Sequence, residues 1–381
     1  SLPLLQLKTP GKNDIKQSPW DPTLTSPQNP GSKPLSSAHL PSPEKQMQRL
    51  PQTRKPSAFR LLQIPRRRQS NEQSHSPPRP LTPHPLLLFI RRQRRLACAT
   101  AAISLQRPAT IVVPLSTSPL MISKLRTLGA DVQQVGNHWS ESDAYMREEL
   151  LGGDKDGVYV PPFDHADVWE GNGTLVDEVE RQMCGYGGYD AVVASVGGGG
   201  LFAGIMAGLS KHGRLEGGGL KGVKVMAVET EGAHSLALSL ERGELSRLDA
   251  ITSIATSLGA TQVANQAFEW AKRKEVTSCV FSDAEAAMGA VCFADDERIV
   301  VEAACGVSLA VAYNDTLHTV LFPDISDDEF SKLNVVLVVC GGSNITLEIL
   351  EKYKQEYARD ERVVQKFHSR RLASETLKKV S

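Results

Sequence analysis

A strand, four consecutive glycines and a helix follow one another between residues 189 and 209, and this succession constrains the fold more than any other feature. Residues 189–196 form an apolar run rich in valine, which is a typical strand composition. The four glycines can adopt backbone angles that are closed to other residues. From Leu201 onward, apolar residues recur at helical spacing. Because the first amide groups of a helix have no intrahelical partner and lie at the positive end of its dipole, the pattern predicts a phosphate-binding turn.

A turn that binds nothing is the alternative interpretation. A glycine costs about 0.5–1 kcal/mol wherever its conformational freedom is not needed, so four in a row favour a ligand over a bare turn. The spacing matches neither G-x-x-x-x-G-K-[ST] nor G-x-G-x-x-G, and the common nucleotide-binding loops are therefore not indicated.

The net charge of zero hides two segments of opposite sign. Residues 1–97 hold 17 Lys and Arg against 4 Asp and Glu, whereas residues 98–381 hold 26 against 39. The first segment also carries 17 of the 23 prolines and has no sustained apolar periodicity, which is the composition of a disordered chain. We therefore expect residues 1–95 to be an aberrant segment, which is either disordered or translated from the wrong reading frame.

After residue 96, strand-like runs alternate with helical stretches, the pattern of an α/β protein with open, mostly parallel sheets. The sequence predicts helices at 96–104, 119–128, 141–150, 173–183, 264–272, 282–293, 302–314 and 346–358, and strands at 109–113, 131–135, 157–160, 189–196, 223–228, 275–280 and 334–340. Ser282 and Glu285 form an S-x-x-E capping box. Two α/β domains are expected, the remnant of a small one at 96–150 and a large one at 151–358, followed by a tail at 359–381.

The cysteines indicate a reducing compartment. The six cysteines are scattered without a C-x-x-C pair, so neither a zinc site nor a disulfide framework is indicated. Reduced thiols and a cytoplasmic location are expected. No apolar run approaches the length of a membrane span and no signal-peptide pattern opens the sequence, so no membrane partner is expected.

A second apolar run, residues 335–340, ends in another glycine turn with the sequence Gly341-Gly342-Ser343-Asn344. Ligands of open parallel sheets gather at the carboxyl ends of the strands, so we expect both glycine turns at one edge of the sheet. Cys340 would point into that crevice, although a cysteine in isolation is more often a packing residue than a chemical one.

Several stretches, in this order, resemble the L-serine/L-threonine dehydratases, which use pyridoxal phosphate (PLP) on the type II fold of the tryptophan synthase β-subunit. They are LACATAA, PATIVVPLSTSPLMISKLRTLGADV, PPFDHADVWEGNGTL, SVGGGGL, AVETEGAHS, TSLGA and VVCGGSN. The likeness runs from Leu96 to about Leu350 and is specifically to the eukaryotic serine dehydratase branch. It implies PLP as the cofactor and L-serine or L-threonine as the substrate, and a homodimer is expected.

The resemblance also implies roles for particular residues. The PLP phosphate would be held by backbone N–H groups of Gly197, Gly198, Gly199, Gly200 and Leu201. Cys340 would meet the pyridine nitrogen, and a thiol leaves that nitrogen less protonated than a carboxylate would, which suits a β-elimination. A monovalent cation, K⁺, would be bound by oxygen atoms of Glu229, Ala233, Ser235, Leu258 and Ala260. Without the resemblance, Glu229 is better interpreted as an ordinary solvated carboxylate at a strand end.

The loops that should carry the catalytic lysine and bind the substrate are missing. In the family, S-F-K-S-R-G supplies the lysine that holds PLP covalently and removes the α-proton, and S-S-G-G-N-A-G binds the substrate carboxylate. Here the residues before Leu96 read FIRRQRR. With permitted codons, a one-base shift turns residues 89–95 into S-S-G-G-N-A-G. The same shift turns residues 54–69 into a segment containing S-F-K-S-R-G, with the lysine arising at Gln63.

We therefore interpret at least residues 54–95 as an out-of-frame reading of a serine dehydratase gene. The arginine runs then imply no nucleic-acid partner, since GGC codons read out of frame give arginine codons. The intact product would convert L-serine to pyruvate and ammonia, whereas the chain as written would be inactive. Two alternatives stay open: a catalytically dead homologue that binds PLP or an amino acid, and a basic-tailed interaction protein on a degenerate enzyme scaffold.

Overall fold

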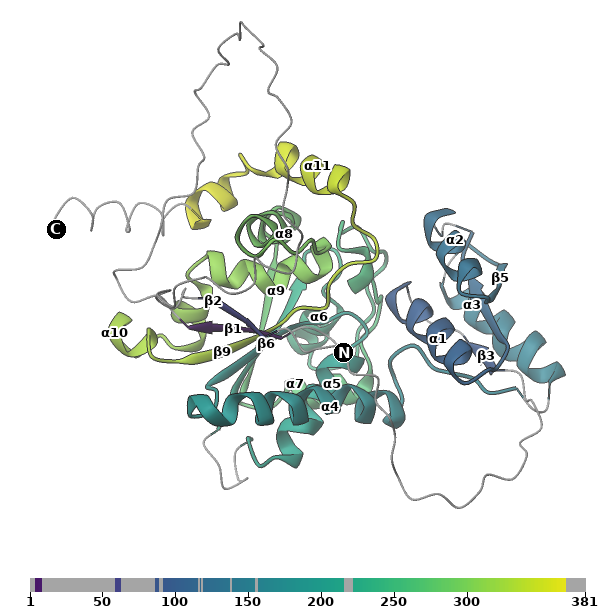
Figure 1. The fold of residues 1–381 in the computed structure, drawn as a ribbon, viewed down its shortest axis with the longest axis horizontal. Coiled ribbons are helices and arrows are strands. Elements are labelled where there is room, and N and C mark those ends of the chain that lie inside the picture. Colours follow the sequence, from purple (N-terminus) through teal and green to yellow (C-terminus); the bar gives the residue numbers. More distant parts are fainter. Residues whose placement is uncertain are drawn as a thin grey trace, which may run out of the picture.

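The computed structural model describes three strands in the first 91 residues and residues 92–367, apart from 116, 118, 138, 155–156 and 216–221. These residues form a larger and a smaller α/β unit (Figure 1). Gln63 and the part of the predicted tail beyond residue 367 lie outside the described residues. The boundaries of the expected domains stay predictions.

The larger unit is built on a six-stranded sheet with the strand order β2-β1-β9-β6-β7-β8. Its strands are β1 (Leu4–Lys8), β2 (Phe59–Leu62), β6 (Ala191–Ser195), β7 (Lys224–Thr230), β8 (Val276–Phe281) and β9 (Asn334–Val338). Strands β9, β6, β7 and β8 run parallel, whereas β1 pairs antiparallel with both β9 and β2. Every residue of β6 and β9 is buried, as expected of central strands covered on both faces.

Helices cover both faces of this sheet (Figure 1). Val192 and Ala194 of β6 pack against one layer of helices, and Ala191 and Val193 pack against the other. The first layer contains α4 (Ala166–Met183), α5 (Gly200–Lys211), α6 (Ser235–Arg242) and α7 (Asn265–Ala271). The second contains α8 (Asp283–Glu297) and α9 (Ala303–Tyr313), with α11 (Leu347–Tyr357) packed outside α8. Short helices lie at Cys184–Tyr186, Thr256–Leu258, Leu317–Leu321, Asp327–Phe330 (α10) and 361–367.

Two pairs of helices approach each other closely through glycines. A Cβ atom on Gly204 of α5 would lie 2.6 Å from the carbonyl oxygen of Trp169, and one on Gly208 would lie 2.7 Å from the Val176 side chain of α4. Between α8 and α9, a Cβ atom on Gly289 would lie 2.9 Å from the Ala310 nitrogen. Real Cβ contacts do not fall below 3.0 Å, so a side chain at these positions would separate the helices.

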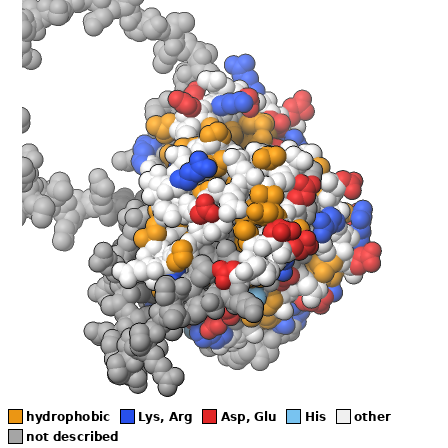
Figure 2. All heavy atoms as spheres, turned by 90° about the vertical axis from the view of Figure 1, so that its right-hand side faces the viewer, with side chains coloured by type: hydrophobic (Ala, Val, Ile, Leu, Met, Phe, Trp, Pro, Cys, Tyr) orange, Lys and Arg blue, Asp and Glu red, His pale blue; other side chains and the backbone are white. Residues whose placement is uncertain are grey.

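The smaller unit has a parallel three-stranded sheet in the order β3-β4-β5. Its elements are β3 (Leu86–Leu88), α1 (Arg92–Ser104), β4 (Ala109–Val113), α2 (Pro119–Thr127), β5 (Asp131–Gln134), α3 (Trp139–Tyr145) and a π-helical turn at Met146–Leu151. Ile111, Met121 and Leu125 are buried in its core. On the face seen in Figure 2, exposed apolar side chains lie among charged ones. Leu115 and Leu120 of the smaller unit are exposed.

Most predicted elements are present within a few residues of their expected ends. Ser282 and Glu285 form the predicted capping box: the Ser282 hydroxyl accepts the Glu285 amide at 3.2 Å, and a Glu285 carboxylate oxygen accepts the Ser282 amide at 3.0 Å. The strand predicted at 157–160 is wrong, because only Val160 forms a bridge. The helix predicted at 141–150 is divided after Tyr145, and α6 was not predicted.

Within residues 1–95, the structure describes three short strands and the start of α1. The strands β1 and β2 lie at the edge of the large sheet and β3 lies at the edge of the small one. Each strand is three to five residues long. The expectation that residues 1–95 are aberrant stays a prediction. Within the described residues, no helix combines the length and apolar character needed to cross a membrane.

Candidate active site

The predicted site residues meet at one edge of the large sheet. Ser195 of β6 pairs with Val228 of β7, so the next residue pair brings Val196, the residue before the glycine turn, level with Glu229. Val193 pairs with Leu337 of β9, and counting on three residues along both strands brings Val196 level with Cys340. All three strands are parallel and end here, so both glycine turns lie at the carboxyl edge of the sheet, as predicted.

The glycine turn points its carbonyl groups at the protein and leaves its amide groups unbonded. The Gly198 carbonyl accepts the Ala264 amide at 3.1 Å, and the Gly200 carbonyl accepts the side-chain amide of Asn172 at 2.9 Å. Within the described parts of the chain, no hydrogen bond is donated by the amides of residues 197–201. Gly199 caps α5 with a φ of 86°, a left-handed conformation that favours glycine. The amides at this helix start are therefore available to an anion.

Each of the four glycines also lies against a protein neighbour. A Cβ atom on Gly197 would lie 3.0 Å from the Leu258 Cα, and one on Gly200 would lie 2.7 Å from the Phe163 carbonyl oxygen. A Cβ atom on Gly198 would meet the Phe163 ring, and one on Gly199 would meet the Ala267 side chain. Close packing thus requires four glycines here, and their number alone is not evidence for a ligand. The evidence is the set of unbonded amides.

Phe163 and Asn172 are site residues that sequence reasoning did not single out. Phe163 lies under the glycine turn, and its carbonyl oxygen accepts the Trp169 indole N–H at 2.9 Å. Asn172 reaches the turn from α4. Both belong to the stretch PPFDHADVWEGNGTL, which resembled the family motif, so the signal was present without a role attached to it.

The turn after β9 is held by the first residues of α9. The sulfur of Cys305 accepts the Cys340 amide at 3.2 Å, and the Glu302 amide donates to the Gly341 carbonyl at 3.3 Å. A Glu302 carboxylate oxygen accepts the Asn344 amide at 3.3 Å. Burial raises the pKa of the Cys305 thiol to about 12, so it accepts these contacts as a neutral group. Cys340 itself is half-buried and packs against both core layers.

The stretch Thr256–Leu258 joins the two glycine turns. Leu258 lies against Gly197, and the Ser257 hydroxyl is 3.4 Å from the Asn344 side-chain nitrogen. The TSLGA motif therefore lies between the amides of one turn and the cysteine-bearing turn beside it, and the structure brings these sequence-predicted segments together.

Glu229 is fully buried, so its interpretation as a solvated carboxylate is wrong. Its two carboxylate oxygens accept the amides of Leu236 and Ala237 at 2.9 and 2.8 Å and so cap α6. Burial raises its pKa to about 8, although the two amides act in the opposite direction. A residue six positions before the helix supplies this cap, which is why the local sequence did not indicate it.

The other predicted cation ligands are also buried close to α6 and the TSLGA stretch. The Ser235 hydroxyl is buried and has no hydrogen-bond partner among the described residues. Ala233, Leu258 and Ala260 are buried as well. No cluster of three His, Cys, Asp or Glu side chains suitable for a metal occurs within the described residues. A cation here would depend on carbonyl oxygens, and the site stays a prediction.

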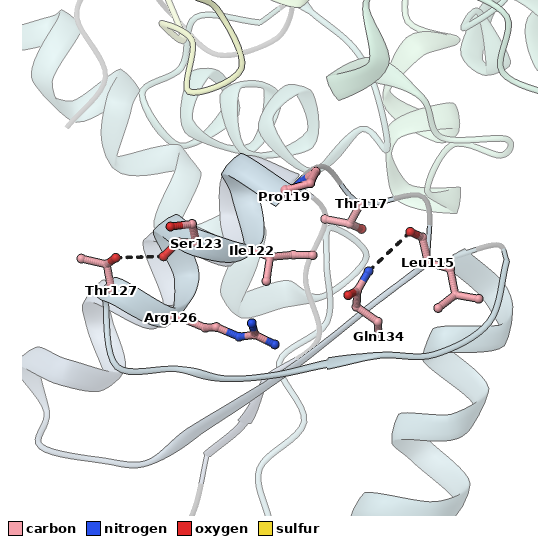
Figure 3. Close-up of a pocket in the computed structure, with 8 residues that line it drawn as sticks. All are labelled: Leu115, Thr117, Pro119, Ile122, Ser123, Arg126, Thr127 and Gln134. Atoms are coloured by element: carbon pink, nitrogen blue, oxygen red, sulfur yellow. Dashed lines mark hydrogen bonds between the residues drawn. The ribbon is translucent and has the colours of Figure 1, made fainter.

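An open groove of about 880 Å³ lies elsewhere, along one face of α2 in the smaller unit (Figure 3). Gln134 donates to the Leu115 carbonyl at one side of it, and Arg126 points into it. None of the predicted cofactor or cation residues lines this groove.

A doubly covered parallel sheet, with unbonded amides beside a cysteine at its carboxyl edge, defines an α/β enzyme that binds a phosphorylated cofactor. The family model described as "Pyridoxal-phosphate dependent enzyme" matches residues 95–341. This chain belongs to that family, and its cofactor is PLP.

Several proteins similar to this chain are named as serine dehydratases or as an L-serine ammonia-lyase. The chain is 38% identical over 262 residues to an L-serine dehydratase of Saccharomyces cerevisiae, covering 66% of this chain and 75% of the relative. It is 41% identical over 267 residues to the serine dehydratase-like protein of Rattus norvegicus, covering 68% and 76%. The solved fungal L-serine ammonia-lyase from Rhizomucor miehei matches with a TM-score of 0.63 at 32% identity, covering 72% of this chain and 83% of that one. The predicted type II fold is confirmed.

The described residues fit PLP at its two ends. Unbonded amides at the start of α5 suit the phosphate, and Cys340 follows the neighbouring strand β9. Gln63, the position predicted to match the family's covalent lysine, lies outside the described residues. The amides and Cys340 are thus compatible with the noncovalent contacts predicted for PLP.

Proposed function

We propose that the intact reading frame of this gene encodes an L-serine dehydratase, which converts L-serine to pyruvate and ammonia and also accepts L-threonine to give 2-oxobutanoate. The names of the yeast and rat relatives and of the fungal structure support this reaction. The observation that carries it is the set of unbonded amides at residues 197–201 beside Cys340.

PLP, when bound, supplies the electron sink that makes the substrate α-proton acidic enough to be removed. The chain's residues set up that chemistry. Because the carbonyls of the glycine turn are bonded to Ala264 and Asn172, its amides are fixed before the phosphate arrives. Cys340 would hold the ring nitrogen through its thiol, which is a weak partner. The electron sink would therefore stay moderate, and a moderate sink is sufficient for loss of a β-hydroxyl.

The chain as written is expected to bind PLP without covalent attachment. After borohydride reduction, mass spectrometry should find no stoichiometric pyridoxyl group, and serine should give no pyruvate. A matched chain in which residues 54–95 are replaced by the shifted reading should gain both properties, because it regains the lysine. Turnover by the chain as written would refute the assignment of the lysine to position 63.

The out-of-frame interpretation has its own test in the nucleotide sequence. The Gln63 codon must be CAA, because only this codon followed by an A yields the lysine codon AAA. A CAG codon, in genomic DNA and transcript alike, excludes the interpretation while leaving the family assignment untouched.

A K⁺ ion bound by Glu229, Ala233, Ser235, Leu258 and Ala260 is part of the proposal. It is supported by the buried, unpartnered Ser235 hydroxyl and by the buried carboxylate of Glu229. PLP affinity measured in K⁺ should exceed that measured in choline at equal ionic strength. Equal affinities in the two salts would remove the ion from the proposal.

A PLP-binding homologue without catalysis is the second candidate, and the glutamine at position 63 favours it for this exact chain. PLP binding without turnover in both chains of the borohydride experiment would support it. We further propose a homodimer, to be tested by sedimentation equilibrium, and a cytoplasmic location, which the six free thiols support.

A further inference from the structure

Lys124 of α2 makes a hydrogen bond that crosses from the smaller unit to the turn after β9. Its ammonium nitrogen donates to the Ser343 carbonyl oxygen at 2.8 Å, between residues 219 positions apart in the sequence. Lys124 is half-buried, and the structure places no Asp or Glu carboxylate within ion-pair distance of it among the described residues. The bond is therefore a charge-assisted contact in a partly dry environment, where such bonds are strongest.

The turn that receives this bond is fixed to the larger unit on its other sides. Cys305 accepts the Cys340 amide, and Glu302 bonds both Gly341 and Asn344. Three hydrogen bonds thus tie the turn to the start of α9. The chain between β9 and α11 runs along the side of the larger unit that faces the smaller one (Figure 1).

Lys124 is equally well fixed on its own side. Its neighbours Met121 and Leu125 are buried in the core of the smaller unit, which holds α2 in place. Arg126, on the same helix, points into the groove on a different face (Figure 3). Since successive helical residues are 100° apart, Lys124 and Arg126 cannot serve the same surface.

We propose that Lys124 is a positioning residue that ties the smaller unit to the Cys340-bearing turn, so that closure of the two units and seating of the cofactor ring are coupled. The Ser343 hydroxyl supports this, because it is buried and has no partner among the described residues: the residue that Lys124 holds retains a polar group for a ligand. The part of the proposal that concerns PLP depends on the proposed function, whereas the tie between the units does not.

The test uses the full chain and three variants. Lys124→Met removes the ammonium at similar length, Lys124→Arg keeps a cation, and Arg126→Met removes the same charge from the same helix without touching the turn. The first readout, without ligand, is hydrogen exchange of the amides in residues 340–344. The second is PLP affinity and the absorbance maximum of bound PLP.

Lys124→Met should raise the exchange rate of residues 340–344 and weaken PLP binding by about three- to tenfold, the effect of losing one hydrogen bond. Lys124→Arg should keep the exchange rate and the PLP affinity close to those of the parent chain. Arg126→Met should change neither quantity. Unchanged exchange in Lys124→Met would overturn the proposal, as would an equal effect of Arg126→Met. If the parent chain binds no PLP, the cofactor assignment fails. Hydrogen exchange still tests whether Lys124 links the smaller unit to the turn after β9.

Discussion

Replacing Gly199 by alanine should destabilise the protein more than the same change at another left-handed glycine. Gly199 has a φ of 86°, and an added Cβ would lie 2.9 Å from the Val263 side chain and closer still to Ala267. Gly243, at the end of α6, has a φ of 72° and no heavy atom within 4 Å of an added Cβ. Alanine would adopt an unfavourable left-handed conformation at both positions. Only at Gly199 would its Cβ atom also clash with neighbouring side chains.

The magnitudes follow from these two contributions. A left-handed conformation costs a residue with a Cβ roughly 1–2 kcal/mol, so Gly243→Ala should lower the free energy of unfolding by about that amount. Overpacking adds about 1–3 kcal/mol at Gly199, because Ala267 and Val263 lie in a buried layer and have little room to move. Gly199→Ala should therefore cost about 2–5 kcal/mol.

Urea unfolding of the two variants and the parent chain measures these differences, provided that all three give the same slope. PLP titration of the folded fraction completes the experiment, since only Gly199→Ala displaces the amides. Equal losses of stability would refute the packing argument. Full PLP affinity in Gly199→Ala would show that the amides of this turn do not bind the phosphate.

Two further predictions concern the pH dependence of two glutamate side chains. Because the pKa of Glu229 is raised to about 8 in the folded protein, its contribution to stability should fall as pH rises from its usual value of 4.5 to about 8, and Glu229→Gln should flatten that part of a pH series of unfolding free energies. Burial acts to raise the pKa of Glu180, but hydrogen bonds from Arg214 and Tyr189 outweigh it and keep the pKa below 4.5. Stability from this group should be present above pH 4.5 and lost below it, and Arg214→Met should cost about 1–3 kcal/mol at neutral pH and little in acid, measured by urea unfolding.

The features that were predicted correctly from the sequence are patterns confined to a few neighbouring residues. The capping box at Ser282 and Glu285 and the strand ending at the glycine turn depend on residues close together in the chain, and the structure confirms both. The parallel register follows from general rules of α/β sheets, so the meeting of Cys340 with the glycine turn was also predictable.

What the sequence did not indicate depends on contacts between distant segments. The cap of α6 comes from Glu229, whose carboxylate was expected in water. The reason for each glycine at 197–200 lies in Phe163, Leu258 and Ala267, and no spacing rule identifies such neighbours. Short strands at β1 and β2 were hidden in a proline-rich composition, because composition averages over many residues whereas pairing needs only four or five.

The glycine contacts along α5 make the cofactor site sensitive to changes far from it. Gly208 lies eight residues beyond Gly200, which is about 12 Å along the helix, yet it touches α4 through Val176. A single methyl group at Gly208 would displace α5 relative to α4. The displacement would also shift the amides at the start of α5. Sequence changes in the α4–α5 contact should therefore alter cofactor affinity, as changes in the glycine turn itself would.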